Sequence, residues 1–164
     1  MLKLTLTRFI GDSNITVGEL KDEYGELRLA TYEKRCPEHW NGMKNFCALP
    51  CGVYKMSFMM IPNTLDETLK VSTTGTYRKA MITGDVLNVP AGSIVVGFSV
   101  ENYRLRGRKD AIDLFVSWLR QKKHDGTLPW NPKAGDVILE IKNAPTFVYE
   151  ETEEKEITDE EYDE

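Results

Sequence analysis

The chain has few cysteines and no long apolar run. Its three cysteines, Cys36, Cys47 and Cys51, are an odd number and too sparse for a disulfide scaffold. The longest apolar stretch, residues 94–100, is far shorter than a membrane-spanning helix. The N-terminal segment MLKLTLTRFIGD alternates apolar and polar residues and lacks the features of a signal peptide. We therefore expect a protein made in the reducing cytoplasm, not exported by a signal of its own and not embedded in a membrane.

The charge is divided unevenly along the chain. Residues 150–164 carry ten carboxylates and one lysine, and so contribute −9 to a formal net charge of −5. Residues 1–149 therefore carry +4. A segment of like charges repels itself and has little apolar surface to bury. We expect one domain over residues 1–149, followed by an acidic tail over residues 150–164 that is mobile or docked on a partner.

Period-two alternation and β-branched runs predict a mainly β protein. Leu2, Leu4 and Leu6 alternate with polar residues, which is typical of a half-buried strand. Gly-containing turns then favour a meander, and later β-branched runs predict additional strands. The predicted strands cover residues 2–9, 15–20, 27–32, 52–60, 69–72, 79–83, 93–100 and 136–142, with an edge strand at 146–149.

One helix is predicted over residues 108–123. Ala111, Phe115 and Leu119 recur at a spacing of four and form one apolar face. Acidic residues lie in its first turns and basic residues in its last, as the helix dipole favours. The predicted fold class is therefore α+β: an antiparallel β-sheet or barrel-like domain with one packed helix and an acidic C-terminal tail.

The other elements are predicted to be arranged around residues 78–102. The pattern predicts a hairpin-like unit, in which a strand over residues 79–83 enters a glycine-containing loop and an almost wholly apolar strand leaves it. Such an apolar strand suits burial on both faces. Gly84, Asp85 and Gly92 in this loop are candidate binding residues.

Several segments resemble the DUF5675 family, domains of bacteria and phages whose function is uncharacterised. They are ITVGEL (residues 15–20), TYE (31–33), ALPCGVY (48–54) and GSIVVG (92–97). The family's middle motif contains a His and a Cys, reminiscent of the L,D-transpeptidases that remodel peptidoglycan.

This sequence departs from the family's middle motif where the chemistry would lie. Ile82 stands in place of the His and Ser93 in place of the Cys. Asp85 and Val89 replace an Asn and an Asp, whereas the glycines that shape the loop are kept. The resemblance therefore implies a similar scaffold without the family's pair of reactive groups.

Ser93 is the one candidate nucleophile in this motif. A serine needs an adjacent base even more than a cysteine does, and Ile82 cannot act as one. The only histidines, His39 and His124, lie in a predicted loop and beyond the predicted helix. The alternative is that Ser93 is simply a small residue at the start of a buried strand.

Cys36, His39, Cys47 and Cys51 form a candidate metal site. These are soft ligands close together in sequence, and thiolate-imidazole sets suit tetrahedral zinc. The competing interpretation is plain loop and strand cysteines, because Cys51 begins a predicted strand whose geometry fixes its direction.

Residues 103–109, YRLRGRK, place Arg104, Arg106 and Arg108 beside a predicted helix N-terminus. This basic loop is a candidate site for phosphate, nucleic acid or the chain's own acidic tail, and a solvated loop is the alternative. The acidic total charge disfavours nucleic acid. A protein partner or self-association through the tail and the basic loop is the favoured interaction.

A long loop is predicted over residues 33–46, and Glu33, Arg35 and Glu38 in it are candidates to line a small pocket beside the glycine loop. An ion-pair cluster on the surface is the alternative. Glu33 also matches a glutamate of the DUF5675 pattern.

Three functional hypotheses follow. The leading one is a non-catalytic binding or structural module of DUF5675 type, associated with a phage or mobile element and so cytoplasmic or carried on a virion. The second is an enzyme acting on peptidoglycan or peptide bonds through Ser93 or a loop cysteine. The third is an adaptor stabilised by zinc.

Overall fold

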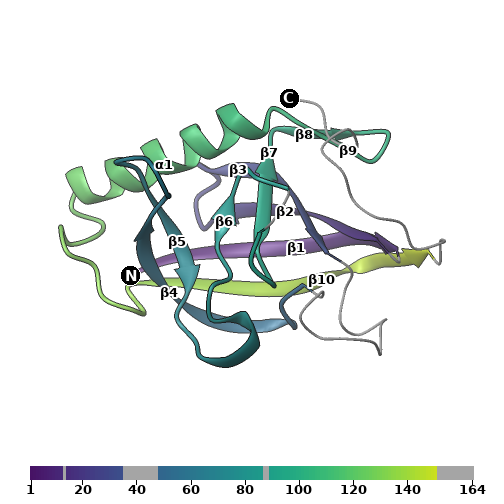
Figure 1. Cartoon of the computed structure of the whole chain (residues 1–164), viewed down its shortest axis with the longest axis horizontal. Helices are drawn as coiled ribbons and strands as arrows, with labels where there is room; N and C mark the ends of the chain where they lie inside the picture. The colour runs from purple at the N-terminus through teal and green to yellow at the C-terminus, as the bar shows by residue number, and fades with distance from the viewer. Residues whose placement is uncertain (13, 35–47, 87–88, 151–164) are drawn as a thin grey trace.

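The computed structural model describes residues 1–12, 14–34, 48–86 and 89–150 (Figure 1). The chain forms ten strands, one α-helix and one short 3-10 helix in this part. In order, they are β1 (Leu2–Asp12), β2 (Ile15–Asp22), β3 (Arg28–Lys34), β4 (Gly52–Met60), β5 (Glu67–Val71), η3 (Gly75–Tyr77), β6 (Ile82–Thr83), β7 (Ile94–Gly97), β8 (Ser99–Glu101), β9 (Arg104–Arg106), α1 (Arg108–His124) and β10 (Val137–Glu150).

The N-terminal meander confirms the alternation in the sequence. The even-numbered residues Leu2, Leu4 and Leu6 are buried in β1, and the residues between them face outward or lie half-buried. β1 pairs antiparallel with β2, which pairs antiparallel with β3. A bulge falls between Arg8 and Ile10, where both neighbours of β1 shift register. Such a bulge bends the strand and re-aims its side chains.

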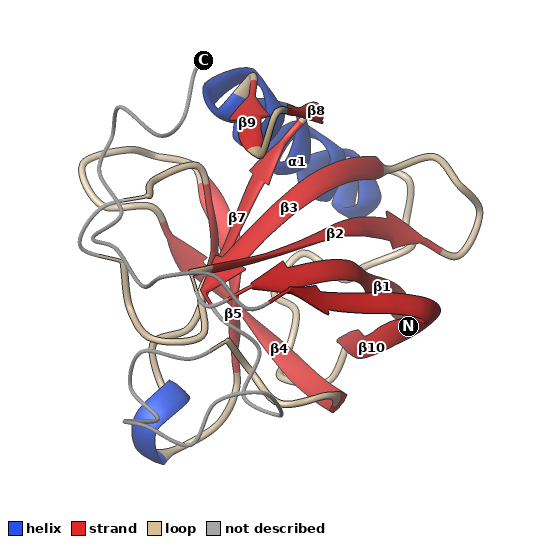
Figure 2. Cartoon of the chain, turned by 90° about the vertical axis from the view of Figure 1, so that its right-hand side faces the viewer, coloured by secondary structure: helices blue, strands red, loops and turns tan. Residues whose placement is uncertain are grey.

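Eight strands form one sheet in the order β5-β4-β10-β1-β2-β3-β7-β6. Most pairs are antiparallel, but β1 with β10 and β6 with β7 are parallel. β10 is one continuous strand of 14 residues between β4 and β1, so the edge strand predicted at residues 146–149 is its C-terminal part. Figure 2 shows the strands curling around a common centre, with α1 on one side. The sheet is nearly closed.

The stretch 78–102 differs from the predicted hairpin. β6 and β7 run parallel, and the crossing between them includes the described residues 84–86 and 89–93. Parallel neighbours cannot be joined by a tight turn, because the chain has to return from the end of β6 to the start of β7. The second strand also ends at Gly97, and the half-exposed Phe98 separates it from β8.

The helix closes the core. Ala111, Phe115 and Leu119 are buried and pack in one cluster with leucines of β1 and β10. Fully burying a side chain such as Phe115 stabilises the fold by about 1.5–3 kcal/mol. The predicted helix is confirmed, and the fold is a β-rich α+β domain with a nearly closed, mostly antiparallel sheet.

None of the helices in the described ranges has the length and apolar character needed to cross a membrane.

Candidate functional site

β6 and the crossing that follows it hold Ile82 and Ser93, the two positions compared above with the DUF5675 motif. Ile82 is fully buried and Ser93 is only 6% exposed. The Met81 backbone N–H donates a hydrogen bond of 3.2 Å to Ser93 Oγ, and the Ser93 N–H donates one of 3.1 Å to the Pro90 carbonyl. The serine hydroxyl thus links the starts of the parallel strands β6 and β7, which Met81 and Ser93 immediately precede.

The glycines of the crossing occupy positions with little room. Gly92 has a φ of +84°, and a Cβ on it would lie 2.7 Å from the Tyr77 ring and 3.1 Å from the Leu49 side chain. A Cβ on Gly84 would lie 3.0 Å from Ile112 of α1. Asp85 is exposed, and its backbone N–H donates to Thr83 Oγ1 at 3.1 Å. The loop glycines are therefore explained by packing.

An ion pair lies inside the protein beside this crossing. Arg8 of β1 and Glu33 of β3 have fully buried side chains. Arg8 Nη2 donates to Glu33 Oε1 at 2.7 Å, and Nε donates to Oε2 at 3.0 Å. The pair is bidentate, the geometry in which a guanidinium recognises a carboxylate best.

A third hydrogen bond from Arg8 links the ion pair to the residues just before β4. Arg8 Nη2 also donates to the Leu49 carbonyl at 2.6 Å, and Nη1 lies 3.8 Å from Cys51 Sγ. Leu49 is also one of the residues that a Cβ on Gly92 would meet, so the ion pair supports the crossing through it. Neither charge is open to solvent, which makes the pair a structural element.

Tyr54 of β4 lies at the edge of the same polar cluster. Its hydroxyl donates to the Pro50 carbonyl at 2.5 Å. Burial raises the pKa of the Tyr54 phenol, while the nearby Arg8 guanidinium acts in the opposite direction. The phenol is therefore neutral and available as a hydrogen-bond donor at neutral pH.

The candidate pocket around Glu33 requires correction. Glu33 lies near the glycine loop as expected, but it is buried against Arg8 and neither lines an open pocket nor belongs to a surface cluster. Arg35 and Glu38 lie outside the described residues. Arg8 had no place among the candidates, although the alternation Leu2, Leu4, Leu6 continues inward to it.

The candidate zinc site falls mostly outside the described residues, which exclude Cys36, His39 and Cys47. Cys51 is exposed, and its thiol lies 3.7 Å from Asn143 Oδ1. Within the part of the chain that the structure covers, no three His, Cys, Asp or Glu side chains are grouped to hold a metal ion. Zinc binding stays a prediction.

The predicted basic loop, residues 103–109, contains β9 of the β8–β9 hairpin and the start of α1, and its three arginines differ. Arg104 is exposed, and Arg106 lies 3.4 Å from the Glu101 carboxylate. Arg108, in contrast, is only 7% exposed, and its Nη1 donates to the Gly84 carbonyl at 3.0 Å. Arg108 therefore anchors the start of α1 to the crossing and is not part of an exposed binding surface.

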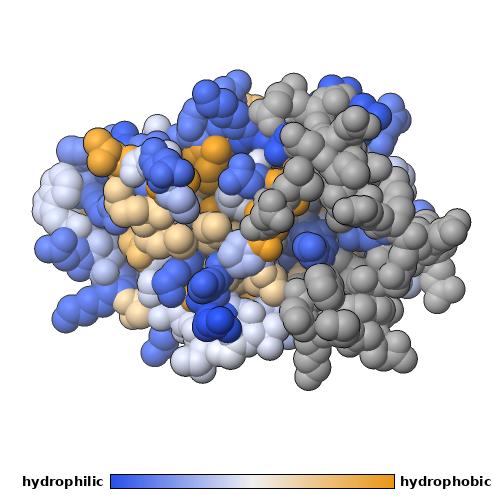
Figure 3. Space-filling model, in the orientation of Figure 1, coloured by the Kyte–Doolittle hydropathy of each residue, from blue (hydrophilic) through white to orange (hydrophobic). Residues whose placement is uncertain are grey.

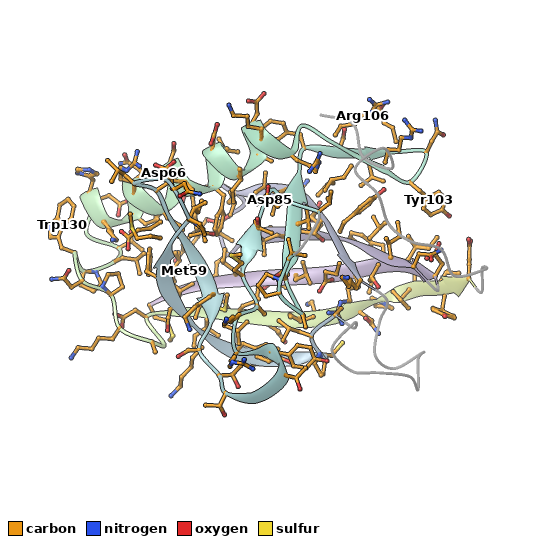
Figure 4. The ribbon with its side chains drawn as sticks, in the orientation of Figure 1. Met59, Asp66, Asp85, Tyr103, Arg106 and Trp130 are labelled. Atoms are coloured by element: carbon orange, nitrogen blue, oxygen red, sulfur yellow. The ribbon has the colours of Figure 1, made fainter. Side chains whose placement is uncertain are left out.

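The acidic tail begins beside this hairpin. Glu150, its first residue, is the last residue of β10, and the Tyr103 hydroxyl donates to its carboxylate at 3.3 Å. Burial is the main cause that raises the pKa of the Tyr103 phenol, and the negative charge of Glu150 raises it as well. Figure 4 shows Tyr103 and Arg106 at the end of the molecule where β10 finishes. The tail therefore leaves the domain next to basic residues.

Of the two histidines, only His124 is described. It ends α1 and packs edge-on against Trp130, with ring centroids 4.9 Å apart. The 17 residues of α1 span about 25 Å, and Arg108 at the other end is the residue bonded to Gly84. The structure thus brings Gly84, Gly92 and Ser93 into one crossing, but it places His124 at the far end of the helix.

Comparison of the chain with protein-family models, with curated proteins and with solved structures finds no match in any of the three.

Proposed function

We propose that this protein is a non-catalytic binding or structural module that acts through a protein partner or a second copy of itself. The observation that carries the proposal is the role of Ser93. Its hydroxyl is buried and accepts the Met81 amide, and the residue in the motif's base position is the buried Ile82. A serine nucleophile needs an adjacent base and access to substrate. The setting in a phage or mobile element rests on the DUF5675 resemblance alone.

The surface proposed for the partner is the β8–β9 hairpin together with the acidic tail. The Tyr103–Glu150 hydrogen bond supports it, because this bond starts the tail, with its net charge of −9, beside Arg104 and Arg106. Opposite charges already held on one chain meet at a high effective concentration. The tail would then bind either the β8–β9 hairpin of its own chain or a partner protein.

Replacing Ser93 with alanine tests the proposed structural role. We expect the free energy of unfolding to fall by about 1 kcal/mol, because the Met81 N–H loses its acceptor. Urea unfolding measures this loss, and Ser99→Ala, at an exposed position of β8, is the matched control with a change within about 0.5 kcal/mol.

A fluorophosphonate probe tests the alternative of an activated serine. We expect it to label neither the wild-type protein nor Ser93→Ala. Labelling of the wild type that disappears in Ser93→Ala would show an activated hydroxyl and would overturn the proposal in favour of a hydrolase or transpeptidase.

Ending the chain after Glu150 tests the role of the tail. We expect the melting temperature to change by no more than about 2 °C, because every described element is retained. A labelled peptide of residues 151–164 is expected to bind this shortened chain, and to bind it more weakly when salt is added.

Two variants locate the peptide on the shortened chain. Arg104→Gln is expected to weaken binding, whereas Lys133→Gln, an exposed change in the loop before β10, is expected to leave it unchanged. Equal affinity for both variants would remove the hairpin from the proposal. A large fall in melting temperature on shortening would show instead that the tail packs on the domain.

A further inference from the structure

The two ends of the eight-stranded sheet meet along a sparse seam. β5 and β6 are its terminal strands, and a single bridge, between Lys70 and Met81, links them. The Val71 N–H donates to the Ala80 carbonyl at 2.8 Å, and Thr68 Oγ1 donates to the Ile82 carbonyl at 2.7 Å. β6 has only two residues, so it can pair with β5 over a short distance only. Side chains of several elements therefore lie over the seam.

A groove of about 580 Å³ lies over this seam. Its lining combines apolar side chains, two hydroxyls and three cations, and comprises Met59, Lys70, Thr73, Thr74, Arg78, Lys79, Met81 and Pro90. Figure 3 shows a pale-orange area over β5 and β6 with blue beside it. The volume falls in the range typical of small-molecule sites, and the mixture of an apolar surface with a few polar groups is typical of them as well.

No described residue neutralises the cations of the groove. Across the described ranges, no carboxylate forms an ion pair with Lys70, Arg78 or Lys79, and the groove lining contains no acidic residue. Other lysines behave differently, as Lys122 and Lys123 each pair with a glutamate at 3.0 and 2.8 Å. Three uncompensated positive charges beside apolar walls concentrate an anion from solution.

The groove is separate from the hairpin proposed to meet the tail. Figure 4 places Met59 well away from Tyr103 and Arg106 along the long axis of the molecule. Its residues belong to β4, β5, the segment before β6 and, for Pro90, the segment after β6, none of which contributes to the β8–β9 hairpin. A ligand in the groove would therefore not depend on the partner interaction.

We propose that this groove binds an amphipathic phosphomonoester, an apolar group that carries one phosphate. The apolar group lies on Met59, Met81 and Pro90, where methionine adapts to varied shapes. The phosphate faces Arg78 and the two lysines. A phosphomonoester carries a charge of about −1.5 to −2 at neutral pH, against −1 for a carboxylate, so a set of three cations suits the phosphate better.

Calorimetric titration of the full chain with octyl phosphate tests the proposal. We expect octyl phosphate to bind at least about tenfold more tightly than inorganic phosphate or octanol, because each of these lacks one of the two interactions. Equal affinity for octyl phosphate and inorganic phosphate, or for octyl phosphate and octanol, would overturn it.

Paired variants then locate the site. Arg78→Gln/Lys79→Gln removes two exposed cations of the groove and is expected to weaken octyl phosphate binding about tenfold. Lys133→Gln/Lys142→Gln removes the same charge at exposed positions elsewhere and is expected to change nothing. If both double variants weaken binding equally, the effect is one of total charge and the proposed site is wrong.

Methyl resonances of methionine provide a readout on the unmodified chain. We expect octyl phosphate to shift the signals of Met59 and Met81, but not that of the buried Met56. Unshifted Met59 and Met81 signals in a saturated sample would contradict the proposal. So would displacement of octyl phosphate by the peptide of residues 151–164, which would make the groove a site for an acidic peptide.

Discussion

Replacing Arg8 with methionine is expected to lower the free energy of unfolding by about 3–5 kcal/mol, because Glu33 is then buried without a cation. The methionine keeps much of the length of the side chain, so the loss of charge and hydrogen bonds dominates. Leu49 also loses the donor to its carbonyl. Urea unfolding of the two proteins at neutral pH measures the difference.

Two further variants separate burial from charge. Lys3→Met removes a cation from the same strand, where the Lys3–Glu140 pair is exposed to solvent and 3.4 Å apart, and it is expected to cost no more than about 1 kcal/mol. Arg8→Met/Glu33→Leu is expected to recover roughly half of the loss, because no unpaired charge then remains. A cost for Arg8→Met as small as that for Lys3→Met would show that the Arg8–Glu33 pair contributes little.

Gly97→Ala is expected to lower the free energy of unfolding by about 2–3 kcal/mol. A Cβ on Gly97 would lie 2.6 Å from the side chain of Leu105 and 2.7 Å from the Arg106 carbonyl oxygen. That oxygen also accepts the Phe98 N–H at 2.8 Å, so the β8–β9 hairpin must move away from β7. Chemical unfolding measures the cost.

Gly25→Ala is the control for this change. A Cβ on Gly25 has no atom within 4 Å, and its φ of +76° leaves only backbone strain of about 1 kcal/mol. Gly97→Ala is expected to cost more, although its backbone has no positive φ. The reverse order would mean that the hairpin adjusts easily and that the space around Gly97 is not what requires glycine there.

The local elements were predictable because their patterns depend on near neighbours. The strand predicted over residues 52–60 coincides with β4 (Gly52–Met60), and the helix predicted over residues 108–123 corresponds to α1 (Arg108–His124). Strict alternation of leucines likewise fixed which face of β1 is buried. In each case burial against one core decides the structure.

Strand partners could not be predicted in the same way. The parallel pairing of β1 with β10 joins the two ends of the described chain, and nothing in either segment encodes the direction of its neighbour. The closeness of β6 and β7 in sequence favours a hairpin, yet the two strands run parallel. Pairing over these distances is set by the whole sheet.

The candidate site was only partly visible in the sequence. Glu33 is a charged residue in a motif and therefore a visible candidate, but its partner Arg8 is 25 positions away. The sequence did contain one signal for this pair. The alternate, buried positions of β1 lead to Arg8, and those of β3 lead to Glu33, which has the opposite charge. No such signal predicts that Arg108 is buried, because its partner is a backbone carbonyl, that of Gly84, and not a charged side chain.

Liquid chromatography with mass spectrometry of muropeptides mixed with the full chain tests the central claim most directly. That claim is that Ser93 links the starts of β6 and β7 through its hydroxyl and does not act as a nucleophile. We predict no turnover above the buffer blank, with identical traces for the wild type and Ser93→Ala. Turnover by the wild type that is lost in Ser93→Ala would contradict the account.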